Sequence, residues 1–324
     1  MSAGALLLLA LALALGLAAP PAAAQIPAAA ESAAARGDTI VADSAIATML
    51  RRNPTSPATR LQVGRWYRRH PFAQLRARGD HYFREAARLA REQRNRALEA
   101  EAEYELGRSA WIRWEQFSHR YRLFGDVTSI DPLRTLSDWR YVENFFREYA
   151  SPDETGLGEG EYDAAEEHAR AALTLAPGHL GATRLLATLL GDRARWEEME
   201  APARAAIRAF RRAPDGYRIL ALAAARRGRD SEAAALFDSA LARMDSVQRW
   251  PYENLGVLLR QAGAARYDSL STAQRAELRQ LYWAVAQPLA LDSVNRALVE
   301  FYARTTYVDL RWTAPDARVV AWGS

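Results

Sequence analysis

Apolar residues recur at intervals of three and four from about residue 44 onward, which is the spacing of one face of an α-helix. Before the last few positions, no stretch alternates convincingly between apolar and polar residues as a strand does. Pro177, Pro214 and Gly228 interrupt the helical pattern at points where a helix has to end. The pattern therefore predicts an all-α fold.

The helical pattern also repeats itself at a nearly constant interval. One set of positions combines a leading residue, a leucine three positions later, a small residue beside it and a further residue three positions on. It occurs as Thr183, Leu186, Ala187 and Leu190, as Tyr217, Leu220, Ala221 and Ala224, and as Tyr252, Leu255, Gly256 and Leu259. The second copy follows the first by 34 residues, and the third follows the second by 35.

A second set of positions recurs at twice this interval, 68 residues. Gly160, Ala165, Ala169 and Ala172 return as Gly228, Ala233, Phe237 and Ala240, and Gly263 stands in the third unit where Gly228 stands in the second. A glycine at the end of a first helix suits a left-handed cap, and small side chains let helix backbones approach. In the second helix that lies halfway between these two copies, Ala206 and Ala209 are the small residues predicted to serve this purpose.

The 34-residue interval resembles the tetratricopeptide repeat, in which each unit is an antiparallel pair of helices that stacks on the next. The match is closest over residues 160–263. Upstream, the weaker matches are Val63–Gly64 with Tyr67 and Leu106–Gly107 with Ala110 as first helices, and Tyr82 to Arg94 as a second helix. The resemblance implies an α-solenoid of tetratricopeptide-like helix pairs over residues 43–268.

An aromatic-rich insert at about residues 117–159 interrupts these repeats. Two interpretations of the insert remain open. It packs over the solenoid as a cap, or it forms a flap that contacts a ligand or partner, since long connections in compact proteins are often functional.

Residues 269–324 differ from the repeats. Ser271 or Thr272 is predicted to cap a helix that runs through Trp283, and a second helix is predicted from about Asp292 to Thr306, after the interruption at Pro288. This segment is similar to the opening of the GWxTD domain. The residues that carry the similarity are Tyr282–Trp283, Pro288–Leu289, Asn295, Glu300, Tyr302, Ala303–Arg304, Tyr307 and Asp309, with Ala321–Trp322–Gly323–Ser324 at the end. Ala321 stands at the motif's first glycine, Ser324 at its threonine, and Gln287 at the usual acidic residue.

The resemblance to the GWxTD domain implies that the chain stops inside that domain, so we expect a truncated domain here. It also implies an exported bacterial protein, because the family is found in such proteins and often beside tetratricopeptide repeats. The family has no established biochemical activity, so the resemblance implies no catalytic residues.

The N-terminal segment predicts export independently. Residues 1–24 carry no charged side chain, and an apolar run from Leu6 to Leu17 is followed by small residues up to Ala24. We interpret residues 1–24 as a signal peptide and expect the protein in the periplasm or cell envelope, with no transmembrane segment in the mature chain. An uncleaved anchor, which would make the protein a structural spacer, remains the alternative. Residues 25–42 are rich in alanine and are predicted to be a flexible linker.

Composition narrows the chemistry that the chain can perform. The chain contains no cysteine and all 43 of its basic residues are arginine, which excludes thiolate metal sites, cysteine nucleophiles and catalytic lysines. The spacing of the five histidines does not suit a metal site, so no cofactor or metal is expected. The net charge of +4 comes from interspersed acidic and basic residues rather than a basic face, so no nucleic-acid partner is expected.

The expected function is therefore binding rather than catalysis. In the repeat family that this chain resembles, the position after the leading large residue of the first helix tends to face the concave groove. Here this position holds Arg184 and then Arg218, and Arg260 lies further along the third unit. These arginines could bind a carboxylate of a protein or peptide partner, although exposed arginines on an Arg-rich surface are the plainer interpretation.

An enzyme remains the alternative function. It would be an envelope hydrolase acting on a glycan or peptide, with carboxylates in the insert, such as Asp131 or Glu143, or in the missing C-terminal part.

Overall fold

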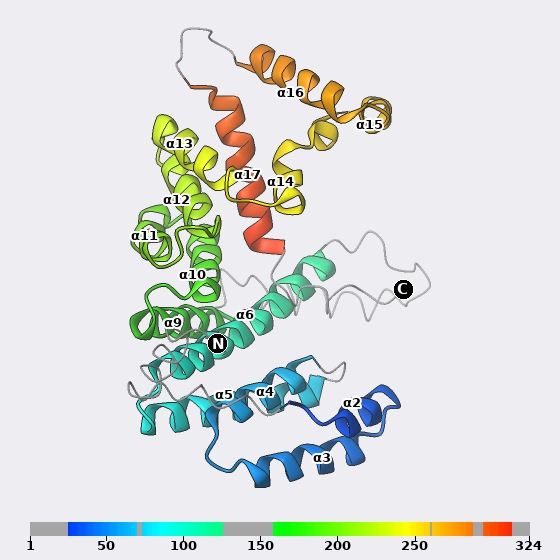
Figure 1. Cartoon of the computed structure of the whole chain (residues 1–324), viewed down its shortest axis with the longest axis vertical. Helices are drawn as coiled ribbons and strands as arrows, with labels where there is room; N and C mark the ends of the chain where they lie inside the picture. The colour runs from blue at the N-terminus through cyan, green and yellow to red at the C-terminus, as the bar shows by residue number, and fades with distance from the viewer. Residues whose placement is uncertain (1–24, 70–72, 126–157, 260, 288–293, 313–324) are drawn as a thin grey trace, which may run out of the picture. The chain divides into compact units, whose positions relative to one another are not determined.

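The computed structural model describes residues 25–69, 73–125, 158–259, 261–287 and 294–312. Every regular element among these residues is a helix, as predicted (Figure 1). The chain divides into two compact units, residues 1–98 and residues 99–324, which are described separately below. The predicted signal peptide, residues 1–24, lies outside the described residues.

The first unit contains helices α2 (Ala28–Ala35), α3 (Thr39–Arg52), α4 (Pro57–Arg68) and α5 (Ala73–Glu92). The segment predicted to be a flexible linker, 25–42, is therefore mostly helical. Ala30 and Ala33 on α2 are fully buried in a cluster that includes Met49 and Trp66. The prediction of a flexible linker is therefore wrong for these residues. Alanines bury little area by themselves, but they pack closely when a larger apolar surface covers them.

Helices α4 and α5 meet at two glycines. A β-carbon on Gly79 would lie 2.9 Å from the backbone oxygen of Gly64, and a β-carbon on Gly64 would lie 2.5 Å from the Phe83 ring. The two backbones can approach this closely only because neither position carries a side chain. Gly64, which the sequence places on a first helix, thus lies at the contact between the paired helices.

We expect Gly79→Ala to destabilise the first unit by about 1–3 kcal/mol, because the new methyl group has to push against a backbone atom. Alanine favours a helix over glycine by about 1 kcal/mol, so the loss would run against helix propensity. Gly160→Ala is the matched control, because a β-carbon there meets no atom within 4 Å. Denaturant unfolding of the two variants tests this, and equal stabilities would contradict the close-contact explanation.

The second unit begins with the long helix α6 (Arg96–Gly125), whose first residues belong to the first unit. Its other helices are α9 (Glu159–Leu175), α10 (Leu180–Asp192), α11 (Glu200–Ala209), α12 (Asp215–Arg226), α13 (Asp230–Leu241), α14 (Ser246–Glu253), α15 (Gln261–Asp268), α16 (Thr272–Ala286) and α17 (Arg296–Trp312), with 3-10 turns at Trp196–Met199 and Leu255–Leu258. Among these, α10 packs against α9 and α12, and α12 packs against α11 and α13.

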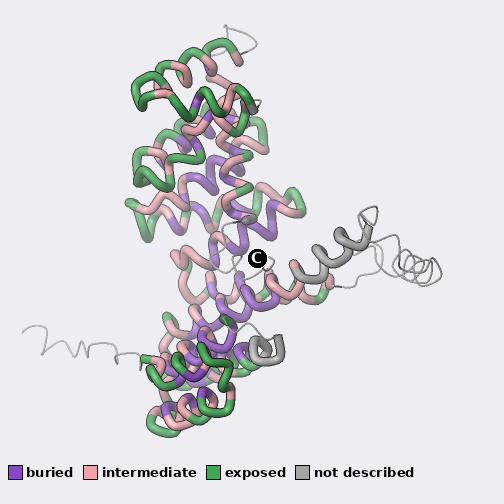
Figure 2. The backbone as a smooth tube through the Cα atoms, turned by 90° about the vertical axis from the view of Figure 1, so that its right-hand side faces the viewer, coloured by how far each residue is buried: buried purple, intermediate pink, exposed green. Residues whose placement is uncertain are grey.

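Burial in the second unit follows the 34-residue interval. Three equivalent positions are buried in each of α9, the segment leading into α11, and α13: Ala165, Ala169 and Ala172; Met199, Ala203 and Ala206; and Ala233, Phe237 and Ala240. Figure 2 shows buried residues on the facing sides of neighbouring helices and exposed residues on their outer sides. On α11 the buried alanines are Ala203 and Ala206, whereas Ala209, which the sequence predicts in this role, is exposed.

The turns after α10 and α12 repeat at the same interval. Ala194 and Gly228 both adopt left-handed backbone angles, with φ of 54° and 71°. The amide of Arg195 donates to the Leu190 carbonyl at 2.8 Å, and the amide of Arg229 donates to the Ala224 carbonyl at 2.9 Å. This confirms the left-handed turn predicted for Gly228. Gly160 does not share it: it lies inside α9, and Gly158 (φ 95°) takes the left-handed conformation instead.

The prediction that the third copy of the repeat begins with one continuous helix is wrong. Helix α14 ends at Glu253, residues 255–258 form a 3-10 turn, and Gly263 lies inside α15 rather than after a helix. The break falls at Asn254, which has an extended backbone and whose side chain accepts a hydrogen bond from the Gly256 amide at 2.8 Å.

Two further boundaries differ from the prediction. Helix α6 continues to Gly125, so the first part of the predicted insert extends this helix; residues 126–157 lie outside the described residues. At the C-terminal side, Ser271 caps α16 as predicted and accepts from the Gln274 amide at 3.3 Å. Helix α17 begins later and ends later than predicted, and the GWxTD-like residues 321–324 lie outside the described residues.

Candidate partner-binding groove

Helices α10 and α12 present matching stripes of side chains to α17. On α10 the stripe consists of Arg184, Thr188 and Asp192, and on α12 it consists of Arg218, Leu222 and Arg226. Residues four apart on a helix share one face, and each α12 position follows its α10 counterpart by 34 residues. We call these six residues the groove. It contains the two predicted binding residues that the structure describes, while Arg260 lies outside the described residues.

The two predicted arginines converge on the same pair of carboxylates. Arg218 donates to Asp215 Oδ1 from Nη2 at 2.6 Å, and Arg184 donates to the same oxygen from Nη1 at 3.2 Å. Asp309 of α17 accepts a hydrogen bond from Arg218 through Oδ2, which also lies 3.6 Å from Arg184 Nη2. The Arg218 side chain is only 8% exposed. Burial opposes its charge, but Tyr252, Asp215 and Asp309 outweigh burial and raise the pKa of Arg218.

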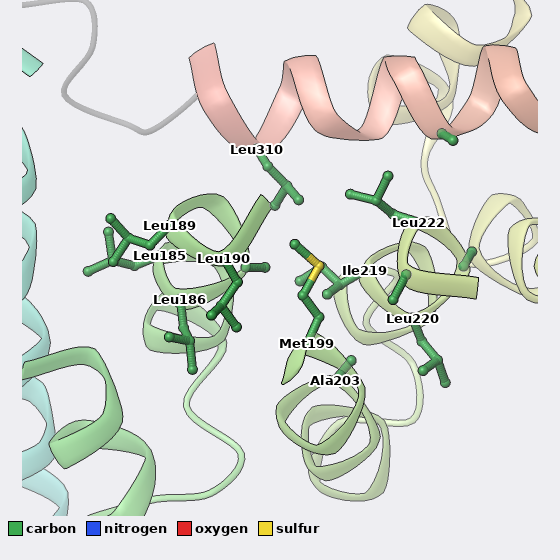
Figure 3. Packing of buried hydrophobic residues seen from close by; sticks show 14 of the residues in the cluster. Leu185, Leu186, Leu189, Leu190, Met199, Ala203, Ile219, Leu220, Leu222 and Leu310 are labelled. Carbon is green, nitrogen blue, oxygen red and sulfur yellow. The ribbon is translucent and has the colours of Figure 1, made fainter. Parts of the chain in front are cut away.

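Mostly apolar contacts lie between the ionic contacts. Val299, Ala303, Thr306 and Leu310 are buried on one face of α17. Figure 3 shows Leu310 pointing from α17 toward the leucines of α10 and α12. The hydroxyl of Thr188 donates to the Leu310 carbonyl at 3.2 Å, and Thr306 hydrogen-bonds the Tyr252 hydroxyl at 3.0 Å.

Ionic contacts hold both ends of α17. Near its start, Glu300 accepts from Arg226 at 2.7 Å, and Arg296 lies 3.3 Å from Asp230 of α13. Near its end, Arg311 pairs with Glu115 of α6 and lies 3.3 Å from Asp192 of α10. The groove therefore holds helix α17 of the same chain through apolar contacts in the middle and ion pairs around them.

The interpretation of Arg184 and Arg218 as simply solvated surface arginines is corrected by these contacts. One partner left a trace in the sequence, because Asp215 stands three positions before Arg218, where a helix brings side chains together. The other partner, Asp309, lies 91 positions away from Arg218, and no local pattern connects the two.

Acid should loosen α17, because the carboxylate of Glu300 helps to hold it. Partial burial opposes ionisation of Glu300, but hydrogen bonds from Arg304 and Arg226 outweigh burial and lower its pKa from the ordinary value of 4.5. A carboxylate with a lowered pKa stabilises the folded state above about pH 4.5 and loses that contribution as the pH falls through its folded-state pKa. Arg304 lies on α17 itself, so only the contact with Arg226 of α12 is lost when α17 is released. Because Glu300 is also 40% exposed, we expect this contribution to be about 0.5 kcal/mol.

Fluorescence energy transfer can measure this loosening. The chain has no cysteine, so Ala235→Cys on α13 and Val308→Cys on α17, both at exposed positions, provide two labelling sites. Energy transfer should fall between about pH 5 and pH 3, and Glu300→Gln should flatten this dependence. An unchanged pH dependence in Glu300→Gln would assign the effect to other carboxylates.

The described residues hold no group of three or more His, Asp or Glu side chains that could bind a metal ion. His168 and His179 instead make paired contacts with α6, to Glu103 and Glu101, each at 2.8 Å. His179 also caps α10 by accepting from the Ala182 amide at 3.1 Å, which explains its position structurally. The alternative catalytic carboxylates, Asp131 and Glu143, lie outside the described residues.

Among the described residues, no helix combines the length and the apolar character needed to cross a membrane. No protein-family model matches this chain, and a search of curated proteins finds no match either.

Proposed function

We propose that this chain is a non-enzymatic interaction module, a tetratricopeptide-like solenoid whose groove binds a protein partner in the periplasm or cell envelope. The proposal rests on one observation above all. Arg184 of α10 and Arg218 of α12 occupy equivalent positions of adjacent repeats. Both contact a carboxylate of α17, which packs against both helices.

The chemistry of the groove supports binding in two ways. Arginine forms planar, multiple hydrogen bonds with a carboxylate, so two neighbouring arginines select for an acidic side chain. Stacked helix pairs place equivalent positions side by side, which lets one extended ligand contact several units. Helix α17, which packs on α10 and α12, shows the size and chemistry of a helix that the groove can bind.

Comparative capture from a bacterial envelope extract tests the proposal. The baits are the full-length wild-type chain, Arg184→Glu and the control Arg212→Glu, which reverses the charge of an exposed arginine outside the groove. Arg184 is the better test residue than Arg218 because its side chain is 30% exposed, so the variant should fold. We expect proteins that wild type and Arg212→Glu retain and Arg184→Glu loses. Identical patterns from all three baits would contradict binding through the groove.

Export belongs to the same proposal and can be tested directly. Intact mass spectrometry of the chain expressed in a bacterial host should give a mature N-terminus near Gln25. A chain that keeps residues 1–24 would favour an anchored spacer.

A further inference from the structure

Without α17, the groove would keep an unbalanced charge. Arg184 and Arg218 share Asp215, so these three groups carry two positive charges and one negative charge. Asp309 supplies the second negative charge from α17. Because Asp215 belongs to α12 itself, it can hold both guanidinium groups in place when α17 is absent, ready for another carboxylate.

The residues of α17 that meet the groove define a pattern. Two carboxylates, Glu300 and Asp309, stand nine positions apart, and the buried face between them carries the small residues Ala303 and Thr306. Basic residues lie outside the two carboxylates, with Arg296 near Asp230 and Arg311 near Asp192. A helix with acidic residues at this spacing, a face of small side chains and basic ends would satisfy the same groups.

The contact of α17 combines an apolar face with charged flanks. Val299, Ala303 and Leu310 belong to the hydrophobic cluster that α10 and α12 share, and Tyr302 and Tyr307 pack against it. Around this face lie ion pairs in which one partner keeps contact with water, such as Glu300 at 40% exposure. An amphipathic helix that binds a groove of another protein has this same arrangement of an apolar face and charged flanks.

We propose that α17 is an intramolecular competitor. The groove binds an amphipathic helix of a partner protein that carries carboxylates in the α17 pattern, and α17 has to leave before that helix can bind. This inference rests on the proposed function, because it identifies the class of partner that the same groove takes.

A labelled peptide with the sequence of residues 296–312 serves as the probe, and the full-length chain serves as the receptor. Ala303→Glu places a charge in the fully buried face of α17, which should release α17 and leave α10 and α12 unchanged. Val308→Glu makes the same substitution at a position on α17 that is 54% exposed, so it is the matched control. Hydrogen exchange of the α17 amides reports release in each variant.

We expect Ala303→Glu to bind the peptide at least tenfold more tightly than wild type and Val308→Glu do. A peptide carrying Asp309→Arg should bind the released chain at least tenfold more weakly than the unchanged peptide. If Ala303→Glu fails to fold, as judged by circular dichroism, Asp309→Arg in the chain serves as a milder releasing variant. The same tenfold difference is expected there.

Three results would overturn the inference. Equal peptide affinity for the released and wild-type chains would show that α17 does not compete. Equal affinity of the Asp309→Arg peptide and the unchanged peptide for the released chain would show that the groove does not require a carboxylate at this position. Concentration-dependent dimers of the wild-type chain that exclude the peptide would assign the groove to α17 of a second copy. If any of these occurs while capture still depends on Arg184, the proposed binding function stands and only the competitor is rejected.

Discussion

Replacing Phe237 by alanine should destabilise the second unit by about 3–5 kcal/mol. Phe237 is fully buried on α13, and its ring packs edge-on against Tyr302 of α17 with 5.5 Å between ring centroids. Truncation removes the transfer energy of the ring and leaves a cavity between α13 and α17 that close-packed neighbours fill only in part. Denaturant unfolding monitored by circular dichroism measures the loss.

Phe210→Ala is the control for the Phe237 experiment. Phe210 follows α11 and is 49% exposed, so the same truncation there should cost about 1 kcal/mol or less. If the two variants lost similar stability, the packing of α17 on α13 would not contribute as the structure indicates.

Replacing Arg218 by leucine should have the second-largest effect, a loss of about 3 kcal/mol. The substitution leaves Asp215 and Asp309 beside an apolar side chain, and removing one partner of a buried ion pair typically costs about 3–5 kcal/mol. We place the expected loss at the lower end because Asp309 keeps 26% of its side-chain surface exposed and can contact water. Hydrogen exchange should show α17 losing protection before α10 and α12 do.

The partner of Arg218 can be identified by a double-mutant cycle. Asp309→Ala combined with Arg218→Leu should cost less than the two single variants added together, by about 1–3 kcal/mol. Arg227→Leu is the control, because Arg227 pairs with Glu200 at the surface and its side chain is 36% exposed. A loss for Arg218→Leu as small as that for Arg227→Leu, which we expect to be below about 1 kcal/mol, would contradict the buried cluster.

Local features of the fold were accessible from the amino-acid order. The position of Gly228 predicted a left-handed turn, and Ser271 predicted the start of α16. Both depend on residues within a few positions of each other, so neighbouring side chains and backbone amides suffice to specify them. The repeated positions of α10, α12 and α13 are buried, apart from the half-buried Tyr217, for the same reason, because periodic spacing defines a helix face.

The errors occurred where distant residues decide the outcome. Residues 25–42 lack bulky apolar side chains, and only the cluster with Met49 and Trp66 gives Ala30 and Ala33 a surface to pack on. The third repeat fails at Asn254, where a side chain competes with the helix for a backbone amide. A repeat signature carries no information about such competition.

The linear order of residues thus specified the helical class, the repeating faces and the equivalent positions of Arg184 and Arg218, because each of these depends on spacing along a single helix or between equivalent helices. It did not specify what those arginines contact. Asp309 reaches Arg218 across 91 positions, and the Thr188 hydroxyl reaches the Leu310 carbonyl across 122. Only packing of the folded chain brings these groups together, since contacts at such separations follow from how whole helices fit against one another and leave no periodic trace.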